Sequence, residues 1–350
     1  MVEVKKHGII LEKTLLEFEN EGVLNPAAIR DGDSVHLFYR AVRNGNHSSI
    51  GYCRLDGPLT VAERWETPII VPELAYESQG VEDARITKID NLYYLTYTAY
   101  DGTNARGALA TSKDLRHFKK HGIIVPHITY AEFVLLAEST GKVDMNYYRN
   151  HNFYYQESDP EKKILLWDKN VIFFPRRIDG KFFFFHRIRP GIQLVSVASL
   201  KDLTKEYWAD YFLNLHTHIV LDPIYEHELS YIGSGCPPIE TEHGWLLIYH
   251  GVHNTKAGLV YTACAALLDL HNPSIEIARL PYPLFVPEFE WEMRGEVNNV
   301  VFPTGTSIFG NTLFIYYGAA DERIACASVN LPELLAELLI NTVKHEIAQS

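Results

Sequence analysis

The chain has 350 residues, of which 47% are hydrophobic, and a formal net charge of −12 at pH 7. A chain of this length can bury a large core, as one big β-domain or as two ordinary domains. The acidic balance argues against nucleic acid and anionic membrane surfaces as partners, because it supplies no basic stripe that could follow phosphates.

The N-terminal residues 1–7 contain no apolar stretch, which argues against a signal peptide. No apolar run approaches the length of a membrane span. The cysteines are far apart, form no CxxC pair and lie mostly in apolar, strand-like runs: Cys53, Cys236, Cys264 and Cys326. We therefore expect reduced, buried thiols in a cytoplasmic protein.

An internal repeat organises the predicted strands. Each copy has a segment rich in proline and small residues, a turn with Gly, Asp or Asn, an apolar strand ending in Tyr or His, and a second strand of small residues. The apolar strands of the five copies are expected at residues 35–40, 92–97, 182–187, 245–250 and 313–318.

Five such copies predict an all-β fold, a five-bladed β-propeller that forms a single domain over residues 1–350. A β-sandwich or two β-domains would not produce five equivalent copies. The spacing indicates an insertion at about 126–165, between blades two and three, and Pro332 begins a predicted C-terminal helix at about 331–347. The insertion is expected either to edge the pocket and help select the acceptor, or to form an oligomer contact in a homo-oligomer or a surface elaboration.

Polar residues recur where the apolar strands of the repeat end. In a radial repeat these positions meet at one mouth, although they are far apart in sequence. Taken singly, Arg187 reads as a surface salt-bridge residue and His250 as a core histidine. Together the positions indicate a pocket for a polyhydroxylated ligand and an anion. They are Tyr39, Arg40, Tyr97, Asp101, His186, Arg187, Tyr249, His250 and Asp321.

Motifs for several other chemistries are missing from the sequence. The 16 histidines include no HExxH and no close histidine pair with a carboxylate, so no metal is expected. No P-loop or G-x-G-x-x-G occurs, and no G-x-S-x-G precedes a helix. We therefore expect carboxylate chemistry without a cofactor.

Residues 79–86, Gln-Gly-Val-Glu-Asp-Ala-Arg-Ile, place two adjacent carboxylates in a strand. Glycoside cleavage normally needs two groups across the scissile bond, but neighbouring strand residues point to opposite faces, so Glu82 and Asp83 should not both line the pocket. Asp83 is the predicted pocket acid, and Glu82 is expected to support Arg85 or an adjacent blade. Asp83 takes the register that prolines hold in three other copies: Pro26, Pro175 and Pro303.

Three segments, residues 80–86, 174–187 and 237–251, resemble the β-mannoside phosphorylases of glycoside hydrolase family 130. The resemblance extends from about Asn25 to Asp321 and implies a five-bladed β-propeller. It also implies inverting phosphorolysis of a β-mannoside, either a manno-oligosaccharide or a mannosyl disaccharide. The products would be α-D-mannose 1-phosphate and a shortened acceptor, with inorganic phosphate as co-substrate.

The resemblance also assigns roles to single residues. Asp83 would be the sole catalytic carboxylate, acting as general acid through the 3-hydroxyl of the mannosyl unit, while phosphate attacks from the opposite face. Lys169 stands where the family has an arginine, and Tyr231 where some relatives have a lysine. The phosphate site would consist of Arg187, His250, Tyr261 and Lys169, and the mannosyl site of Asn25, Arg40, Asp101 and Asp321.

The two departures from the family pattern leave an alternative open. Some family members are β-1,2-mannosidases that hydrolyse the same class of substrate and have lost much of the phosphate cluster. A carbohydrate-binding propeller without catalysis is a third hypothesis. Arg187, His250 and Tyr261 together favour phosphorolysis.

Overall fold

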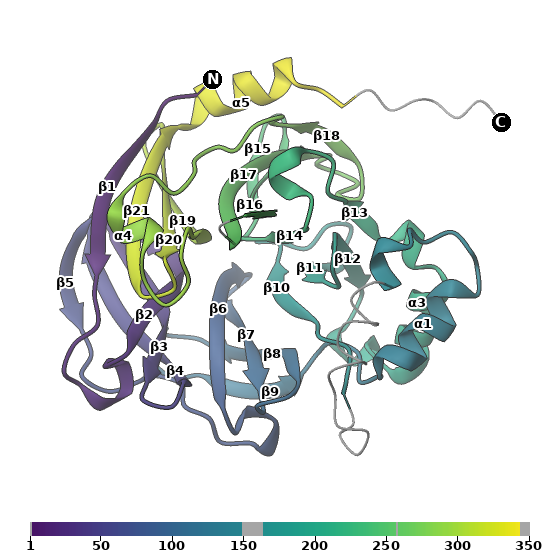
Figure 1. The fold of residues 1–350 in the computed structure, drawn as a ribbon, viewed down its shortest axis with the longest axis horizontal. Coiled ribbons are helices and arrows are strands. Elements are labelled where there is room, and N and C mark those ends of the chain that lie inside the picture. Colours follow the sequence, from purple (N-terminus) through teal and green to yellow (C-terminus); the bar gives the residue numbers. More distant parts are fainter. Residues whose placement is uncertain (1, 149–163, 257, 344–350) are drawn as a thin grey trace.

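The computed structural model describes residues 2–148, 164–256 and 258–343. Strands dominate the described residues, and their hydrogen bonds define four sheets. Figure 1 shows these sheets arranged around a common centre. No helix in the described ranges is long and apolar enough to cross a membrane.

The strands form successive antiparallel meanders, which we number in chain order. The first comprises β2 (Gly22–Asp31), β3 (Ser34–Arg43), β4 (His47–Asp56) and β5 (Thr60–Arg64), and the second β6 (Gly80–Ile89), β7 (Leu92–Tyr100), β8 (Ala105–Ser112) and β9 (Lys119–Ile123). A single parallel bridge between Ser48 and Gly80 joins these two meanders into one sheet. The third comprises β10 (Lys169–Phe173), β11 (Phe182–Arg187), β12 (Ile192–Val197) and β13 (Ile219–Leu221).

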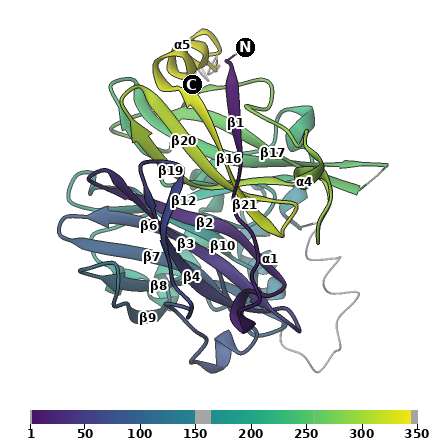
Figure 2. The same ribbon diagram turned by 90° about the vertical axis from the view of Figure 1, so that its left-hand side faces the viewer.

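The fourth meander comprises β14 (Tyr231–Ser234), β15 (Ile239–Thr241), β16 (Gly244–Thr255), β17 (Gly258–Leu268) and β18 (Glu276–Arg279). The fifth comprises β19 (Val301–Phe309), β20 (Thr312–Ala319) and β21 (Arg323–Asn330), and the N-terminal strand β1 (Val4–Leu11) completes it. Figure 2 shows β1 running beside β21. Apolar side chains fill the space between neighbouring sheets; for example, the rings of Phe174 and Trp245 meet edge to face at 5.0 Å.

Helices are few in the described chain. The predicted C-terminal helix is present as α5 (Leu331–Ile340), and Asn330 caps it by accepting from the Glu333 amide. The predicted end at 347 is wrong, because the helix stops at Ile340 and the next residues pair with β18, where Val343 N donates to Ile277 O. Residues 344–350 lie outside the described ranges.

Two further helices pack together beside the third meander. α1 (Tyr130–Glu138) lies in the predicted insertion, of which residues 149–163 lie outside the described ranges. α3 (Lys205–Leu213) connects β12 to β13 and was not predicted from the sequence. The rings of Phe133 and Phe212 join the two helices edge to face at 5.4 Å.

The first strands of three meanders carry equivalent β-bulges. The strand register slips between Leu24 and Ala27 in β2, between Glu82 and Arg85 in β6, and between Lys169 and Ile172 in β10. At each slip one residue adopts a left-handed backbone, which Asn and Asp tolerate well: Asn25, Asp83 and Asn170, with φ of 50°, 50° and 56°.

These bulges correct the repeat register expected from the sequence. Asp83 is equivalent to Asn25 and Asn170, and not to Pro26 or Pro175. Pro175 follows the end of β10, so it cannot share the position of a residue within β6. Pro303 does keep the expected register, because it pairs with Tyr317 as Asp83 lies opposite Tyr97. Pro26 and Pro175 are out of register, because a bulge adds a residue that sequence spacing alone does not reveal.

A buried glutamate anchors each of four meanders. Each glutamate is fully buried and lies in a short helical turn. Its carboxylate accepts a hydrogen bond from a strand tyrosine and forms an ion pair with a basic residue. The cation satisfies the charge that burial would otherwise leave unpaired. We call these groups the Glu–Tyr clamps; they are Glu19–Tyr39–Arg64, Glu77–Tyr97–Lys120, Glu228–Tyr249–Arg279 and Glu292–Tyr317–Lys6.

Candidate active site

Asp83 lies at the bulge of β6, with 12% of its side chain exposed. Asn25 Nδ2 donates to Asp83 Oδ1 at 2.8 Å, and Arg40 NH1 lies 3.9 Å from the same oxygen. Burial alone would raise the pKa of Asp83, but Arg40, Arg85, Lys169 and the Asn25 hydrogen bond together lower it below its usual value. Asp83 is therefore ionised at neutral pH in the unliganded protein.

Glu82 faces the same arginine as Asp83. Glu82 Oε1 lies 2.9 Å from Arg40 NH2, and its other oxygen lies 4.0 Å from Lys169 Nζ. The expectation that the two carboxylates point to opposite faces is therefore wrong. The reason is the bulge, because the left-handed backbone at Asp83 interrupts the alternation of a regular strand.

The expected pairing of Glu82 with Arg85 is also wrong. The Arg85 side chain donates instead to the backbone oxygens of Gly235, Asp83 and Ala84, at 2.5, 2.9 and 2.9 Å. Glu82 instead pairs with Arg40 on β3 of the neighbouring meander. This agrees with the other alternative predicted from the sequence, in which Glu82 supports an adjacent part of the repeat.

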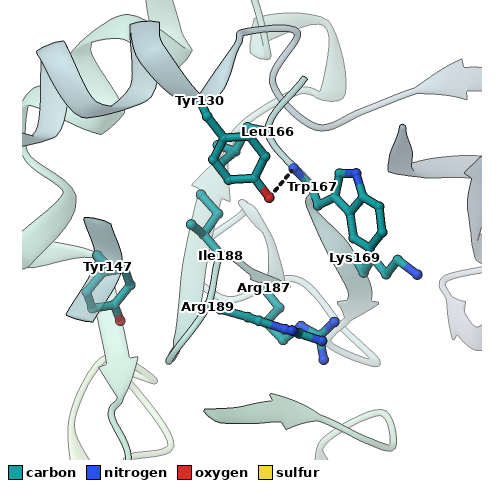
Figure 3. A pocket seen from close by; sticks show the side chains of 8 residues that line it. All are labelled: Tyr130, Tyr147, Leu166, Trp167, Lys169, Arg187, Ile188 and Arg189. Atoms are coloured by element: carbon teal, nitrogen blue, oxygen red, sulfur yellow. Dashed lines mark hydrogen bonds between the residues drawn. The ribbon is translucent and has the colours of Figure 1, made fainter. Parts of the chain in front are cut away.

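A pocket rich in cations lies beside this carboxylate pair. Lys169, Arg187 and Arg189 line it together with aromatic side chains (Figure 3). Arg187 is 8% exposed, and burial followed by repulsion from Arg189 lowers its pKa. Burial also lowers the pKa of Lys169, although Glu82 and Asp83 oppose this effect. Several positive charges held close together under burial are poorly compensated without an anion. We name this space the cationic pocket.

His250 supplies a neutral group next to these cations. Burial, reinforced by Arg187, Arg85 and Arg189, lowers the pKa of His250 well below its usual value. Arg187 NH1 donates to His250 Nε2 at 3.3 Å, so the ring hydrogen of the neutral imidazole lies on Nδ1. The His250 ring also packs on Phe302, with centroids 4.3 Å apart.

Two tyrosines complete this side of the site. The Tyr231 and Tyr261 hydroxyls share a hydrogen bond of 2.6 Å. The Arg189 guanidinium lies 3.8 Å from the centre of the Tyr231 ring, and that of Arg187 lies 5.3 Å from it. Burial raises the pKa of Tyr261, so both its hydroxyl and the arginines nearby can donate to an anion. The structure thus brings Arg187, His250 and Tyr261 together and places Lys169 in the same pocket as Arg187.

Unpartnered buried polar atoms gather among these residues. Buried polar groups in folded proteins normally have partners, so such a group of exceptions indicates where a ligand binds. Most of them are nitrogens that can donate, which suits an anionic or hydroxylated ligand. Those in the site are Arg187 Nε, His250 Nδ1, Asn170 Nδ2, Arg85 NH2 and Asn25 Oδ1, and the described residues hold four more such atoms outside it, on Tyr148, His216, His227 and His253.

A second pocket opens on the other side of the carboxylate pair. Arg40 and Asp321 line it, together with the β3–β4 turn and Glu296. Burial, opposed by Arg40 and aided by Asp83 and Glu82, raises the pKa of Asp321 to about 6. Asn25 packs against Gly318, where an added Cβ would lie 2.1 Å from Asn25 Oδ1, so only glycine fits there. We name this space the acidic pocket.

The raised pKa of Asp321 predicts a pH-dependent stability. The folded protein binds the proton more tightly than the unfolded chain, so this group stabilises the fold at low pH. That stability is lost as pH rises through about 6. We expect Asp321→Asn to be more stable than the unaltered protein at pH 8, by about 1–2 kcal/mol, and to lose most of this advantage at pH 4, near the unfolded pKa. Urea unfolding of both proteins at the two pH values measures the difference, and an equal difference at both would contradict the assignment.

Asp101 is the predicted site residue that the structure does not join to the others. Its carboxylate accepts from the backbone amides of Thr103 and Asn104, at 2.9 and 2.6 Å, and shapes its own turn. In the described chain it makes no hydrogen bond or ion pair with Asp83 or Arg40.

Sequence reasoning missed three polar residues of the site. Glu82 was assigned to the wrong face, and Arg189 and Asn170 were not considered. Arg189 follows Arg187 by two residues, a spacing that could have identified it. Asn170 follows Lys169 and repeats the bulge position of Asn25, which becomes recognisable only once the bulge register is known.

One cluster outside the site has the spacing of metal ligands. Donor atoms of His227, Glu228 and Cys264 lie within 4.8 Å of one another. However, Arg279 NH1 lies 3.2 Å from Glu228 Oε2, and burial raises the pKa of the Cys264 thiol. A cation there would face Arg279 and would need a thiolate that burial disfavours, so we assign no metal to it.

Comparison with known proteins identifies the family of the chain. Residues 17–339 match the model of a family described as beta-1,4-mannooligosaccharide phosphorylase, Glyco_hydro_130. The chain belongs to glycoside hydrolase family 130. A beta-1,2-mannobiose phosphorylase from Thermoanaerobacter sp. (strain X514) is 34% identical over 89% of this chain and 91% of its own length. A 1,2-beta-oligomannan phosphorylase from the same strain is 32% identical over 95% of this chain and 99% of its own.

Solved structures of similar proteins share the fold of this family 130 member. The beta-1,2-mannobiose phosphorylase of Listeria innocua superposes with a TM-score of 0.73 at 23% identity, over 97% of this chain and 100% of its own. A structure described as belonging to GH130 glycoside hydrolases that target beta-1,2 mannosidic linkages in Candida mannan superposes with a TM-score of 0.69 at 22% identity. It covers 93% of both chains.

Proposed function

We propose that this protein catalyses the inverting phosphorolysis of a β-mannoside to α-D-mannose 1-phosphate and a shortened acceptor. The observation that carries the proposal is the cationic pocket beside Asp83, with unpartnered buried nitrogens on Arg187, His250 and Asn170. A water nucleophile needs a carboxylate base, whereas phosphate brings its own charge and needs cations to bind it. The curated relatives named as phosphorylases support the same reaction.

In this mechanism Lys169, Arg187, His250 and Tyr261 bind and orient phosphate. A phosphate oxygen attacks the anomeric carbon while the bond from that carbon to the glycosidic oxygen breaks. The 3-hydroxyl of the mannosyl unit gives its proton to the departing oxygen, and Asp83 resupplies that proton. The two negative charges of phosphate offset the cations that lower the pKa of Asp83, so phosphate binding itself favours the protonated acid.

The acidic pocket would hold the mannosyl unit. Asn25, Arg40 and Asp321 approach Asp83 from this side, and their amide, guanidinium and carboxyl groups suit sugar hydroxyls. We keep Asp101 in the proposal as a residue that shapes the adjacent turn.

We further propose that the meanders are the blades of a five-bladed propeller forming one domain over residues 1–350. The equivalent bulges and the Glu–Tyr clamps support this reading, because they repeat one local design around a common centre. The insertion at 126–165 would border the site, because Tyr130 and Tyr147 line the cationic pocket. This supports a role at the pocket edge over a purely oligomeric one.

Hydrolysis is the second candidate, and two residues favour it. Lys169 stands where the family has an arginine, so a single ammonium group replaces a planar guanidinium. Tyr231 stands where some relatives have a lysine, so one positive charge is missing. Arg189 compensates in part, because it brings another guanidinium to the same pocket.

One assay separates these candidates. The protein is incubated with β-1,2- and β-1,4-linked mannobiose and longer chains, with and without inorganic phosphate. We expect α-mannose 1-phosphate only when phosphate is present. Equal release of free mannose in both conditions would establish the hydrolase instead, and tight sugar binding without turnover would establish the binding protein.

A further inference from the structure

The third meander departs from the Glu–Tyr clamps of the other four. Tyr39 and Tyr97 each lie opposite the bulge of the preceding strand, and His186 occupies the equivalent place in β11. Its partner carboxylate comes from Asp168, the residue before β10. In the third meander, which carries Lys169 and Arg187, different residues thus take the place of the Glu–Tyr clamp.

The replacement is a buried chain of three polar side chains. Asp168 Oδ2 lies 2.7 Å from His186 Nδ1, and His186 Nε2 lies 2.7 Å from the Tyr211 hydroxyl. Asp168 and His186 are 0% exposed, and Tyr211 is 2% exposed. The chain is therefore isolated from solvent, where hydrogen bonds hold their geometry most firmly.

Each inner member of this chain is the sequence neighbour of a residue in the cationic pocket. Asp168 precedes Lys169, and His186 precedes Arg187. Asp168 and His186 therefore face away from the pocket, whereas Lys169 and Arg187 face into it. Asp168 Oδ1 also accepts from the Arg187 backbone amide at 3.3 Å. One carboxylate therefore fixes both strands on which the pocket cations stand.

The outer end of the chain is fixed by helices. Tyr211 lies on α3, where its hydroxyl donates to Leu194 O at 3.1 Å and its ring stacks on His218 at 4.0 Å. α3 in turn packs against α1, which supplies Tyr130 to the pocket wall. α1 and α3 thus support the wall of the cationic pocket.

We propose that Asp168, His186 and Tyr211 are positioning residues of the phosphate site, which hold Arg187 and Lys169 in the geometry that binds phosphate. The inference rests on the proposed phosphorolysis. Recognition of phosphate by an arginine depends on the orientation of its planar fork, and Arg187 Nε has no partner of its own in the described residues. Its orientation is set by the hydrogen bond from NH1 to His250 and by its backbone, which Asp168 holds.

A matched pair of variants tests this role. Tyr211→Phe and Tyr317→Phe each remove one hydroxyl that bonds a buried group, but Tyr317 belongs to a Glu–Tyr clamp away from the cationic pocket. We expect both to lower the melting temperature. Only Tyr211→Phe should raise the Kd and the KM for phosphate, by about three- to tenfold, while the KM for the mannoside stays unchanged. Asp168→Asn should raise the phosphate KM by about tenfold or more.

Calorimetric titration with inorganic phosphate distinguishes the two ways in which the idea could fail. If the unaltered protein binds no phosphate, the proposed function and this inference are both overturned. If it binds phosphate and Tyr211→Phe binds it equally well, only the positioning role is overturned. The same holds if Tyr317→Phe weakens phosphate binding as much as Tyr211→Phe does, because the effect would then be one of general stability.

Discussion

Replacing Asp83 by asparagine is expected to lower the rate of phosphorolysis by about three orders of magnitude, because the only proposed proton donor is lost. Asparagine has nearly the same shape and keeps an oxygen that can accept from Asn25 Nδ2. The fold and the binding of phosphate should therefore survive. The measurement is kcat for α-mannose 1-phosphate formation, together with circular dichroism and a phosphate titration of the variant.

Glu82→Gln provides the contrast, because Glu82 is the other carboxylate facing Arg40. It is already paired with Arg40 and with Lys169, so it acts through their placement. We expect this variant to lose about tenfold in rate, the scale of one weakened charge-assisted hydrogen bond. If Glu82→Gln were the more damaging change, the roles assigned to the two carboxylates would have to be exchanged.

Replacing Arg187 by alanine is expected to lower kcat/KM for phosphate by about a hundredfold or more. Arg187 contacts His250 and Tyr231 in the cationic pocket, so its loss removes a buried cation and leaves its neighbours unsupported. Arg187→Lys should recover part of the loss, because it restores the charge but not the planar fork. Initial rates over a range of phosphate concentrations measure both effects.

Arg176→Ala is the matched control for this change. Arg176 pairs with Glu240 at 2.7 Å, and both side chains are about 40% exposed. Exposed pairs contribute little, so the phosphate KM should change by less than about twofold. A phosphate KM that is unaltered in Arg187→Ala would remove Arg187 from the phosphate site.

Much of the architecture could be predicted because it repeats. The apolar strand of each copy appears as β3, β7, β11, β16 and β20, and the ends of two of these strands meet where Arg187 contacts His250. The end of α5 was misplaced because helical periodicity continues past Ile340, while pairing with β18 stops the helix. α3 was missed because its apolar positions face α1, a contact between segments more than 60 residues apart that single-sequence periodicity does not report.

The site was predicted through equivalence of strand ends, and the error in placing Glu82 comes from the bulge in β6. A bulge displaces the alternation of a strand by one residue, so the rule that separated Glu82 from Asp83 did not apply there. Asn and Asp at the bulges give a weak signal, because both are also common in ordinary turns. Asn170 becomes recognisable only once the bulge register is known, whereas the spacing of Arg189 from Arg187 is already visible in the sequence.

Because β1 pairs with β21, a newly made chain can complete its fifth meander only late in synthesis. Val4 pairs with Val329, and Lys6 reaches the buried Glu292, so β1 must wait until β21 has been synthesised. At bacterial or eukaryotic elongation rates that wait is roughly 15 to 60 s. Asp321 lies between β20 and β21, so a nascent chain cannot present a complete acidic pocket before its final sheet emerges. Catalysis is thereby confined to chains in which β1 and β21 have already paired.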